Sequence, residues 1–142
     1  MEAEKPKRKK TTSPTQRSLK QLRKDGWVCQ VVERWCAFSR RRVDLYGGID
    51  VLCIKPGETL GVQACAGAST AARLTKLLAE PKLRTWVAAG NRLEVHGWRL
   101  IKRGLPKPKW LADVRVIQLA DFADVPEAGV AKRETKPTET NG

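Results

Sequence analysis

Two apolar segments joined by a proline-glycine turn lie in the middle of the chain. Residues 51–54 read Val-Leu-Cys-Ile without a polar side chain, which is typical of a strand buried on both faces. Residues 55–58 read Lys-Pro-Gly-Glu, a turn sequence, and residues 60–66 return as the antiparallel neighbour. A hairpin buried on both faces needs helices to cover it, so the sequence predicts an α/β layer structure.

The flanking segments supply the other elements. Ser13-Pro14 is a helix-start signal, and Gly26 is a natural helix end. A strand over 27–32 follows, then a basic connection at 39–42, the hairpin, a helix from Thr70, a helical turn from Pro81 to Gly90 and an alternating strand over 92–101. The expected order is α-β-β-β-α-(α)-β, with residues 114–119 as a late edge strand.

A length of 142 residues is enough for one domain. We expect a disordered basic arm over 1–12, a single domain over 13–125 and a disordered tail over 126–142. No apolar run reaches the length of a membrane span, and the N-terminal segment lacks the apolar core of a signal peptide. The sequence therefore predicts an intracellular, cytoplasmic protein without a membrane partner.

The charge is strongly positive. Twenty-eight Lys and Arg residues against 15 Asp and Glu residues give a net charge of +13. Only part of this excess lies in the first 24 residues, so the domain itself is basic and a polyanionic partner, above all nucleic acid, is expected. The residues predicted to contact the phosphate backbone are Lys9, Lys10, Arg17, Lys20, Arg40, Arg41 and Arg42.

Other residue types point to packing more than to chemistry. The four cysteines form no C-x-x-C pair, which favours reduced thiols over a zinc site. Trp27, Trp86 and Trp98 are expected in the core, whereas Trp35, in a polar segment, is the candidate for stacking on a base. His96 is either a packing residue or a general base.

Asp50 and Gln63 form the one pattern suited to metal chemistry. Asp50 opens the first strand of the hairpin and Gln63 lies in the second, and directly opposed side chains in such a pair have Cβ atoms about 5 Å apart. Carboxylate and amide oxygens, with the backbone carbonyl of Ala64, are hard ligands of the kind that Mg²⁺ or Mn²⁺ prefers. A cation held there could act on a phosphodiester.

Residues 14–102, with Glu33, Asp50 and Gln63-Ala64-Cys65 across a turn and before a capped helix, resemble the PD-(D/E)XK nuclease superfamily. The likeness is to its small Holliday-junction-resolvase-like and VRR-NUC-like members and to uncharacterised phage proteins. It implies a restriction-endonuclease-like core, a mixed four-stranded sheet flanked by helices. It also implies that Asp50 binds the metal and that Gln63 takes the (D/E) position.

The usual lysine position of this superfamily holds Cys65, which cannot supply a positive charge. The resemblance then implies that Lys76 or Arg73, on the following helix, supplies it. The acid that many relatives carry on their first helix is missing here, and Glu33 or Asp44 could replace it. Alternatively, Asp44 caps the turn after it, and Glu33 pairs with Arg34 or Arg40.

The sequence thus predicts a Mg²⁺-dependent DNA endonuclease of resolvase-like type. Such an enzyme could act as a homodimer. If a phage encodes it, we expect it in the host cell. A catalytically inactive nucleic-acid-binding protein on the same fold is the main alternative. A basic structural or assembly protein of a phage is the third.

Overall fold

The computed structural model describes residues 12–122, 125, 126 and 128. The arm predicted over 1–12 and the tail predicted over 126–142 lie outside the described residues, except for Thr12, Pro126 and Ala128.

The helices form where the sequence predicts them. The described chain contains α1 (Pro14–Lys24), α2 (Thr70–Leu78), α3 (Pro81–Ala88) and the 3₁₀ turns η1 (Gly67–Ser69) and η2 (Leu119–Phe122). The Ser13 side chain accepts a hydrogen bond from the Gln16 N–H at 3.1 Å, which caps α1. After α1, Gly26 has φ +95°, a left-handed conformation that glycine adopts without strain. No helix in this part of the chain has the length and apolar character needed to cross a bilayer.

The central sheet is mixed and has five strands, in the order β1-β4-β5-β6-β7. These strands are β1 (Val28–Val31), β4 (Val51–Lys55), β5 (Glu58–Ala66), β6 (Arg92–Ile101) and β7 (Lys109–Ile117). β5 and β6 are parallel, and the other neighbours are antiparallel. The α/β class, the flanking helices and the order of the helices and main-sheet strands are confirmed. The expected count of four strands is corrected to five because β7 pairs along its whole length with β6.

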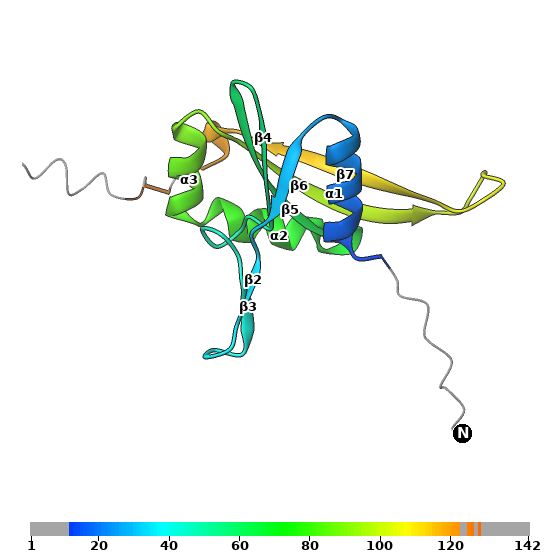
Figure 1. Cartoon of the computed structure of the whole chain (residues 1–142), viewed down its shortest axis with the longest axis horizontal. Coiled ribbons are helices and arrows are strands. Elements are labelled where there is room, and N and C mark those ends of the chain that lie inside the picture. The colour runs from blue at the N-terminus through cyan, green and yellow to red at the C-terminus, as the bar shows by residue number, and fades with distance from the viewer. Residues whose placement is uncertain (1–11, 123–124, 127, 129–142) are drawn as a thin grey trace, which may run out of the picture.

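A short hairpin outside the main sheet interrupts the expected connection between β1 and β4. It consists of β2 (Arg34–Cys36) and β3 (Arg41–Val43), with Arg34 opposite Val43 and Cys36 opposite Arg41. Figure 1 shows this hairpin projecting away from the body of the molecule. The prediction of a plain basic connection at 39–42 was wrong, because three-residue strands with polar side chains leave no apolar alternation to detect.

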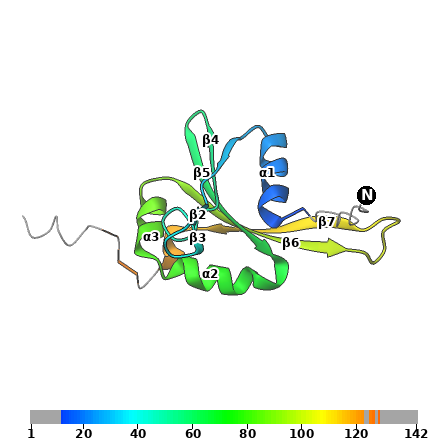
Figure 2. The ribbon, with the colours of Figure 1, turned by 60° about the horizontal axis from the view of Figure 1, so that its bottom comes forward.

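Each face of the sheet has its own core. α1 covers one face, where Leu19, Leu22 and Trp27 pack with Val51 and Val62. α2 and α3 cover the other, where residues of the helices meet residues of β5, β6 and β7. Figure 2 shows the two layers of helices on opposite sides of the sheet. The buried residues of this second cluster are Ile49, Cys65, Leu77, Leu83, Leu93, Val95, Ile117 and Phe122.

A buried chain of hydrogen bonds joins α1 to β6. The Trp98 indole N–H donates to Ser18 Oγ at 2.9 Å, and Ser18 Oγ lies 2.9 Å from His96 Nδ1. His96 Nε2 lies 2.9 Å from Glu94 Oε1, and the hydrogen bond with His96 lowers the pKa of the Glu94 carboxyl. Because the Glu94 carboxylate can only accept, His96 Nε2 donates to it, and in the neutral ring Nδ1 then accepts from the Ser18 hydroxyl. Ser18 is fully buried, so this serine-histidine-carboxylate chain fastens α1 to the sheet and offers no nucleophile to a substrate.

Replacement of Ser18 by alanine is therefore expected to destabilise the protein. It leaves the buried Trp98 N–H and His96 Nδ1 without partners, which costs about 1–3 kcal/mol of unfolding free energy. Urea denaturation measures this loss. Gln16→Ala, an exposed change on the same helix, is the control and is expected to cost less than about 0.5 kcal/mol. Equal stabilities of the two variants would contradict the role assigned to Ser18.

Candidate metal centre

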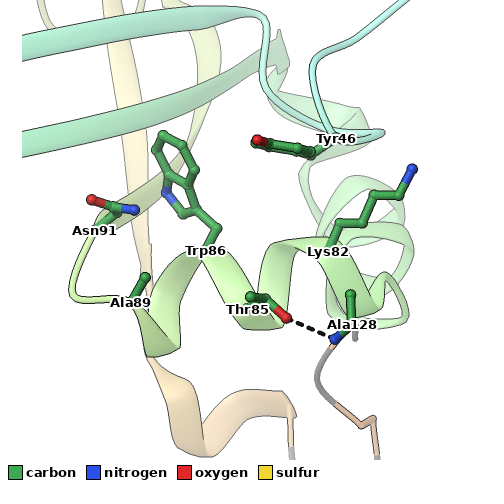
Figure 3. Close-up of a pocket in the computed structure, with 7 residues that line it drawn as sticks. All are labelled: Tyr46, Lys82, Thr85, Trp86, Ala89, Asn91 and Ala128. Atoms are coloured by element: carbon green, nitrogen blue, oxygen red, sulfur yellow. Dashed lines mark hydrogen bonds between the residues drawn. The ribbon is translucent and has the colours of Figure 1, made fainter. Parts of the chain in front are cut away.

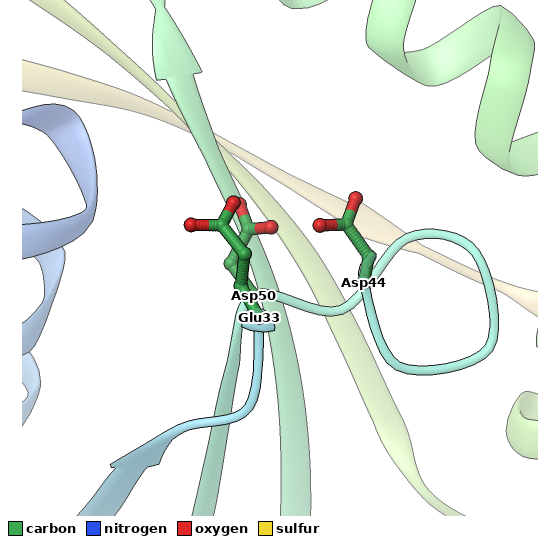
Figure 4. A group of neighbouring side chains, drawn as sticks. All are labelled: Glu33, Asp44 and Asp50. Carbon is green, nitrogen blue, oxygen red and sulfur yellow. The ribbon is translucent and has the colours of Figure 1, made fainter. Parts of the chain in front are cut away.

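Three carboxylates meet where the projecting hairpin joins the sheet. Glu33 immediately precedes β2, Asp44 immediately follows β3 and Asp50 immediately precedes β4. One oxygen from each lies within 4.8 Å of the others (Figure 4). The backbone holds them there, because the N–H groups of Val32 and Glu33 both donate to the Asp50 carbonyl, at 2.8 and 3.3 Å. This is the only such group of potential metal ligands in the described residues.

Asp50 forms the buried floor of this cluster, with 2% of its surface exposed. Its Oδ2 accepts hydrogen bonds from the Gln63 side-chain amide and from the Ala64 N–H, the latter at 3.0 Å. Its Oδ1 is buried with no hydrogen-bond partner in the part of the chain that the structure describes. Burial raises the pKa of Asp50 to about 7; the Ala64 N–H opposes this shift, and the neighbouring Asp44 carboxyl adds to it. Among the described residues, the Asp50 carboxyl has no ion-pair partner of its own.

Gln63 lies beside Asp50, as the sequence predicts, with 2% of its surface exposed. Its amide nitrogen faces Asp50, and its Oε1 is buried without a partner among the described residues. A half-turn of the amide would exchange the positions of oxygen and nitrogen, and these two orientations differ little in shape. The Ala64 carbonyl leaves β5 on the same side as the N–H that binds Asp50, so the third predicted ligand also faces the cluster.

The two acids at the hairpin take roles that the sequence left open. Glu33 Oε1 pairs with Arg42 at 2.6 Å, rather than with Arg34 or Arg40, and the carboxylate still lies within the cluster. The Asp44 carboxyl interacts with Asp50, and the Asp44 backbone carbonyl accepts a hydrogen bond from the Gly47 N–H of the turn at 3.3 Å. Both side chains are thus available to a cation.

Gly48 is needed for the turn that carries Asp44 to Asp50. A Cβ atom at this position would lie 2.0 Å from Leu77 Cδ2 and 2.8 Å from Leu83 Cδ1. The absence of a side chain lets the turn pack against α2 and α3. The position of Asp44 therefore depends on the core beneath it.

A polar cavity of about 510 Å³ adjoins the carboxylates. Asp44 and Glu80 line it, and so do four cations from two separate parts of the chain. Those cations are Arg41, Arg42, Lys76 and Lys82. The structure thus brings predicted backbone-binding arginines and the predicted assistant Lys76 to the side of the acidic cluster.

Cys65 is buried at the end of β5, and burial raises the pKa of its thiol. A hydrogen bond with Thr70 and the positive charge of Arg73 lower that pKa, while the Asp50 charge raises it. Cys65 therefore lies within electrostatic reach of both Arg73 and Asp50. The Arg73 charge therefore acts on the position where a lysine was expected.

Other predicted residues lie elsewhere. Arg17 and Lys20 line a separate cavity of about 300 Å³ with Trp98 and Trp110, and the Arg17 guanidinium stacks 3.7 Å from the centre of the Trp110 ring. Arg40 occupies the turn of the projecting hairpin with φ 56°. Lys9 and Lys10 are outside the described residues, and His96 belongs to the buried chain described above.

The donor set fits a hard divalent cation. Mg²⁺ is usually held by one or two carboxylates with water and substrate oxygens, and this cluster presents three carboxylates and unpartnered buried oxygens. No thiol or imidazole belongs to the cluster, which argues against zinc.

No protein-family model, curated protein or solved structure matches this chain. The site must therefore be interpreted from its own geometry.

Sequence reasoning did not assign three side chains beside this site to a functional role. Trp86 packs against the core, as predicted, but it is only half-buried and also lines a second cavity with Tyr46 and Lys82. The sequence could have singled out Tyr46, because an aromatic residue is unusual in a turn directly before Gly47-Gly48. Lys82 follows Pro81 at the start of α3, and nothing in its spacing distinguishes it from an ordinary surface lysine.

Proposed function

We propose that this protein is a metal-dependent nucleic-acid endonuclease, with DNA as its substrate. The observation that carries the proposal is the cluster of Glu33, Asp44 and Asp50, which has unpartnered buried oxygens at its base and a cationic cavity at its side. Three carboxylates this close repel one another unless a proton or a cation lies among them. The four cations of the cavity suit the phosphates of the polyanion that a net charge of +13 favours.

In this proposal Asp50, Asp44 and Glu33 hold Mg²⁺ or Mn²⁺, with the Ala64 carbonyl and the Gln63 amide beside them. A cation bound there supplies Lewis-acid polarisation of the phosphodiester and a water of lowered pKa. Arg41 and Lys76 hold the strand by its phosphates, and Asp44 lines the same cavity as these cations. Glu33 fixes the Arg42 guanidinium by their ion pair, so that this cation is oriented before the substrate arrives.

A nucleic-acid-binding protein without catalysis is the second candidate. Cys65 favours it, because this buried thiol cannot stabilise negative charge in the transition state as a lysine would. The resemblance to PD-(D/E)XK nucleases supports the fold equally in both cases.

A cleavage assay distinguishes the two candidates. Branched DNA, linear DNA and RNA of the same sequence are incubated with the protein in Mg²⁺, in Mn²⁺ and in chelator. Cutting that requires the metal supports the nuclease. Binding that weakens steeply with salt, without cutting in either metal, would leave only the binding protein.

The cationic assistant gives a separate prediction. Lys76→Ala and Arg73→Ala are each expected to slow cleavage, and the residue that replaces the missing lysine should cost about 10²–10³-fold in rate. Lys107→Ala and Arg103→Ala, exposed changes in the turn between β6 and β7, are the matched controls and should keep full activity. Full activity of both Lys76→Ala and Arg73→Ala would exclude the proposed assistants.

A further inference from the structure

A second cavity, of about 310 Å³, lies over α3 and apart from the carboxylates. The rings of Tyr46 and Trp86 form its walls, as Figure 3 shows. Their centroids are 6.1 Å apart and their planes meet at 54°. The remaining lining residues are Lys82, Thr85, Ala89, Asn91 and Ala128.

Tyr46 is held in this position at a conformational cost. Its φ of 52° lies in the left-handed region, which an aromatic residue rarely occupies. Two backbone hydrogen bonds to the Leu45 carbonyl, from Gly48 at 3.1 Å and from Ile49 at 2.9 Å, close the turn around it. The Tyr46 side chain is nevertheless 47% exposed, so burial of the ring does not account for the strained backbone. Strain of this kind accumulates at ligand-binding sites.

A hydrogen bond and core packing hold Trp86 in place. Its indole N–H donates to the Arg92 carbonyl at 2.8 Å, and part of its ring packs against the core beneath α3. At this separation the two rings contact each other, so no planar group fits between them. They form an open aromatic corner of the cavity, here called the slot, with one rigid wall and one wall set by a strained turn. A flat, aromatic ligand can lie against the open face of either ring.

The aromatic slot adjoins the cationic cavity beside the carboxylates. Tyr46 and Lys82 line both cavities. Asp44, a member of the acidic cluster, is only two residues from Tyr46. A ligand with a planar ring and a phosphate could therefore place the ring in the slot while its phosphate contacts Lys82 and the neighbouring cations.

We propose that this slot binds the base of one unpaired nucleotide in the strand that the cationic cavity holds. The inference rests on the proposed function, because it assumes a nucleic-acid substrate. Bases stack on aromatic side chains whatever their sequence, and Asn91 offers a donor and an acceptor to the edge of a base. A base inside a duplex cannot enter such a slot without leaving the stack. We therefore expect a preference for substrates with a single-stranded nucleotide in the bound strand.

The test uses Tyr46→Gly, because glycine adopts positive φ without strain and the variant is expected to fold at least as well as the wild type. Binding is measured with a short single-stranded oligonucleotide and a blunt duplex of the same sequence, each as DNA and RNA, with Ca²⁺ in place of Mg²⁺. We expect Tyr46→Gly to weaken single-strand binding about tenfold and to change duplex binding less than about twofold. Tyr46→Phe keeps the ring and should bind as the wild type does. Phe38→Ala, which removes a ring that is 99% exposed in the turn of the projecting hairpin, should change neither affinity.

An unchanged single-strand affinity in Tyr46→Gly would overturn the inference, and so would an equal loss on the duplex. A marked fall in the melting temperature of Tyr46→Gly without bound oligonucleotide would also overturn it, because the ring would then be held in place for its packing against Trp86 and not for a ligand. The proposed nuclease fails separately, if no substrate is cut in any metal. Ring-dependent binding of single strands would then still establish the base-binding slot.

Discussion

Replacing Asp50 by asparagine is expected to abolish metal-dependent cleavage, with a fall in rate of at least about a thousandfold, or about 4 kcal/mol of transition-state stabilisation. Asp50 is the most buried member of the acidic cluster and the one with an unpartnered oxygen, so it contributes most to holding a cation. The asparagine oxygen can still accept from Gln63 and Ala64, which preserves the packing around the site. Initial rates of cleavage in Mg²⁺ and Mn²⁺ measure the effect.

Asp113→Asn is the control for this change. Asp113 lies on β7 and pairs with Arg115 at 3.2 Å, away from the acidic cluster, so its neutralisation should leave cleavage intact. Binding of DNA by Asp50→Asn should remain, because the cations of the cavity are unchanged. A cleavage rate of Asp50→Asn equal to that of the wild type would remove Asp50 from the active site.

Stability without metal is expected to fall as the pH rises from about 4 to about 7. The pKa of Asp50 is raised to about 7 by burial, whereas an unfolded aspartate has a pKa of about 3.9. Between these two values the folded state keeps a proton on Asp50 that the unfolded chain has released, so each increase in pH favours unfolding. The loss reaches a few kcal/mol and levels off above pH 7, since each pKa unit corresponds to about 1.4 kcal/mol. Urea denaturation at a series of pH values measures it.

Asp50→Asn isolates this contribution, because the variant has no proton to lose at that position. The difference in unfolding free energy between variant and wild type should therefore grow in favour of the variant from pH 4 to pH 7. Mg²⁺ should stabilise the wild type more at pH 8 than at pH 5, because its ligands must be deprotonated. The same pH dependence in both proteins, or equal stabilisation by Mg²⁺ at both pH values, would show that Asp50 is not the group that titrates.

The parts of the fold that the sequence predicts are those encoded locally. The Ser13 cap and Gly26 define α1, and the alternation over 92–101 corresponds to β6. The β2–β3 hairpin escaped prediction because its strands are three residues long and mostly exposed. β7 was placed too late in the chain because its exposed, charged residues hide the start of the strand.

The candidate site is predictable only in part, for the same reason. Asp50 and Gln63 face each other across a hairpin whose turn is visible in the sequence, so their proximity follows from register. Asp44 reaches Asp50 through a turn that is set by packing against α2 and α3. The left-handed conformation of Tyr46 and the pairing of Glu33 with Arg42 likewise depend on tertiary contacts that no local pattern records.

The projecting hairpin has a consequence for how this protein could be modified. Glu33 and Asp44 lie at the base of the hairpin, one just before β2 and one just after β3. The pairing of Arg34 with Val43 fixes the distance between them. The turn at the far end, around Phe38 and Arg40, does not enter that geometry. Residues could therefore be added or removed at the tip, or a different arm grafted there, while the spacing of the carboxylates stays the same. The length of the hairpin and the spacing of the carboxylates at its base can therefore change independently of each other.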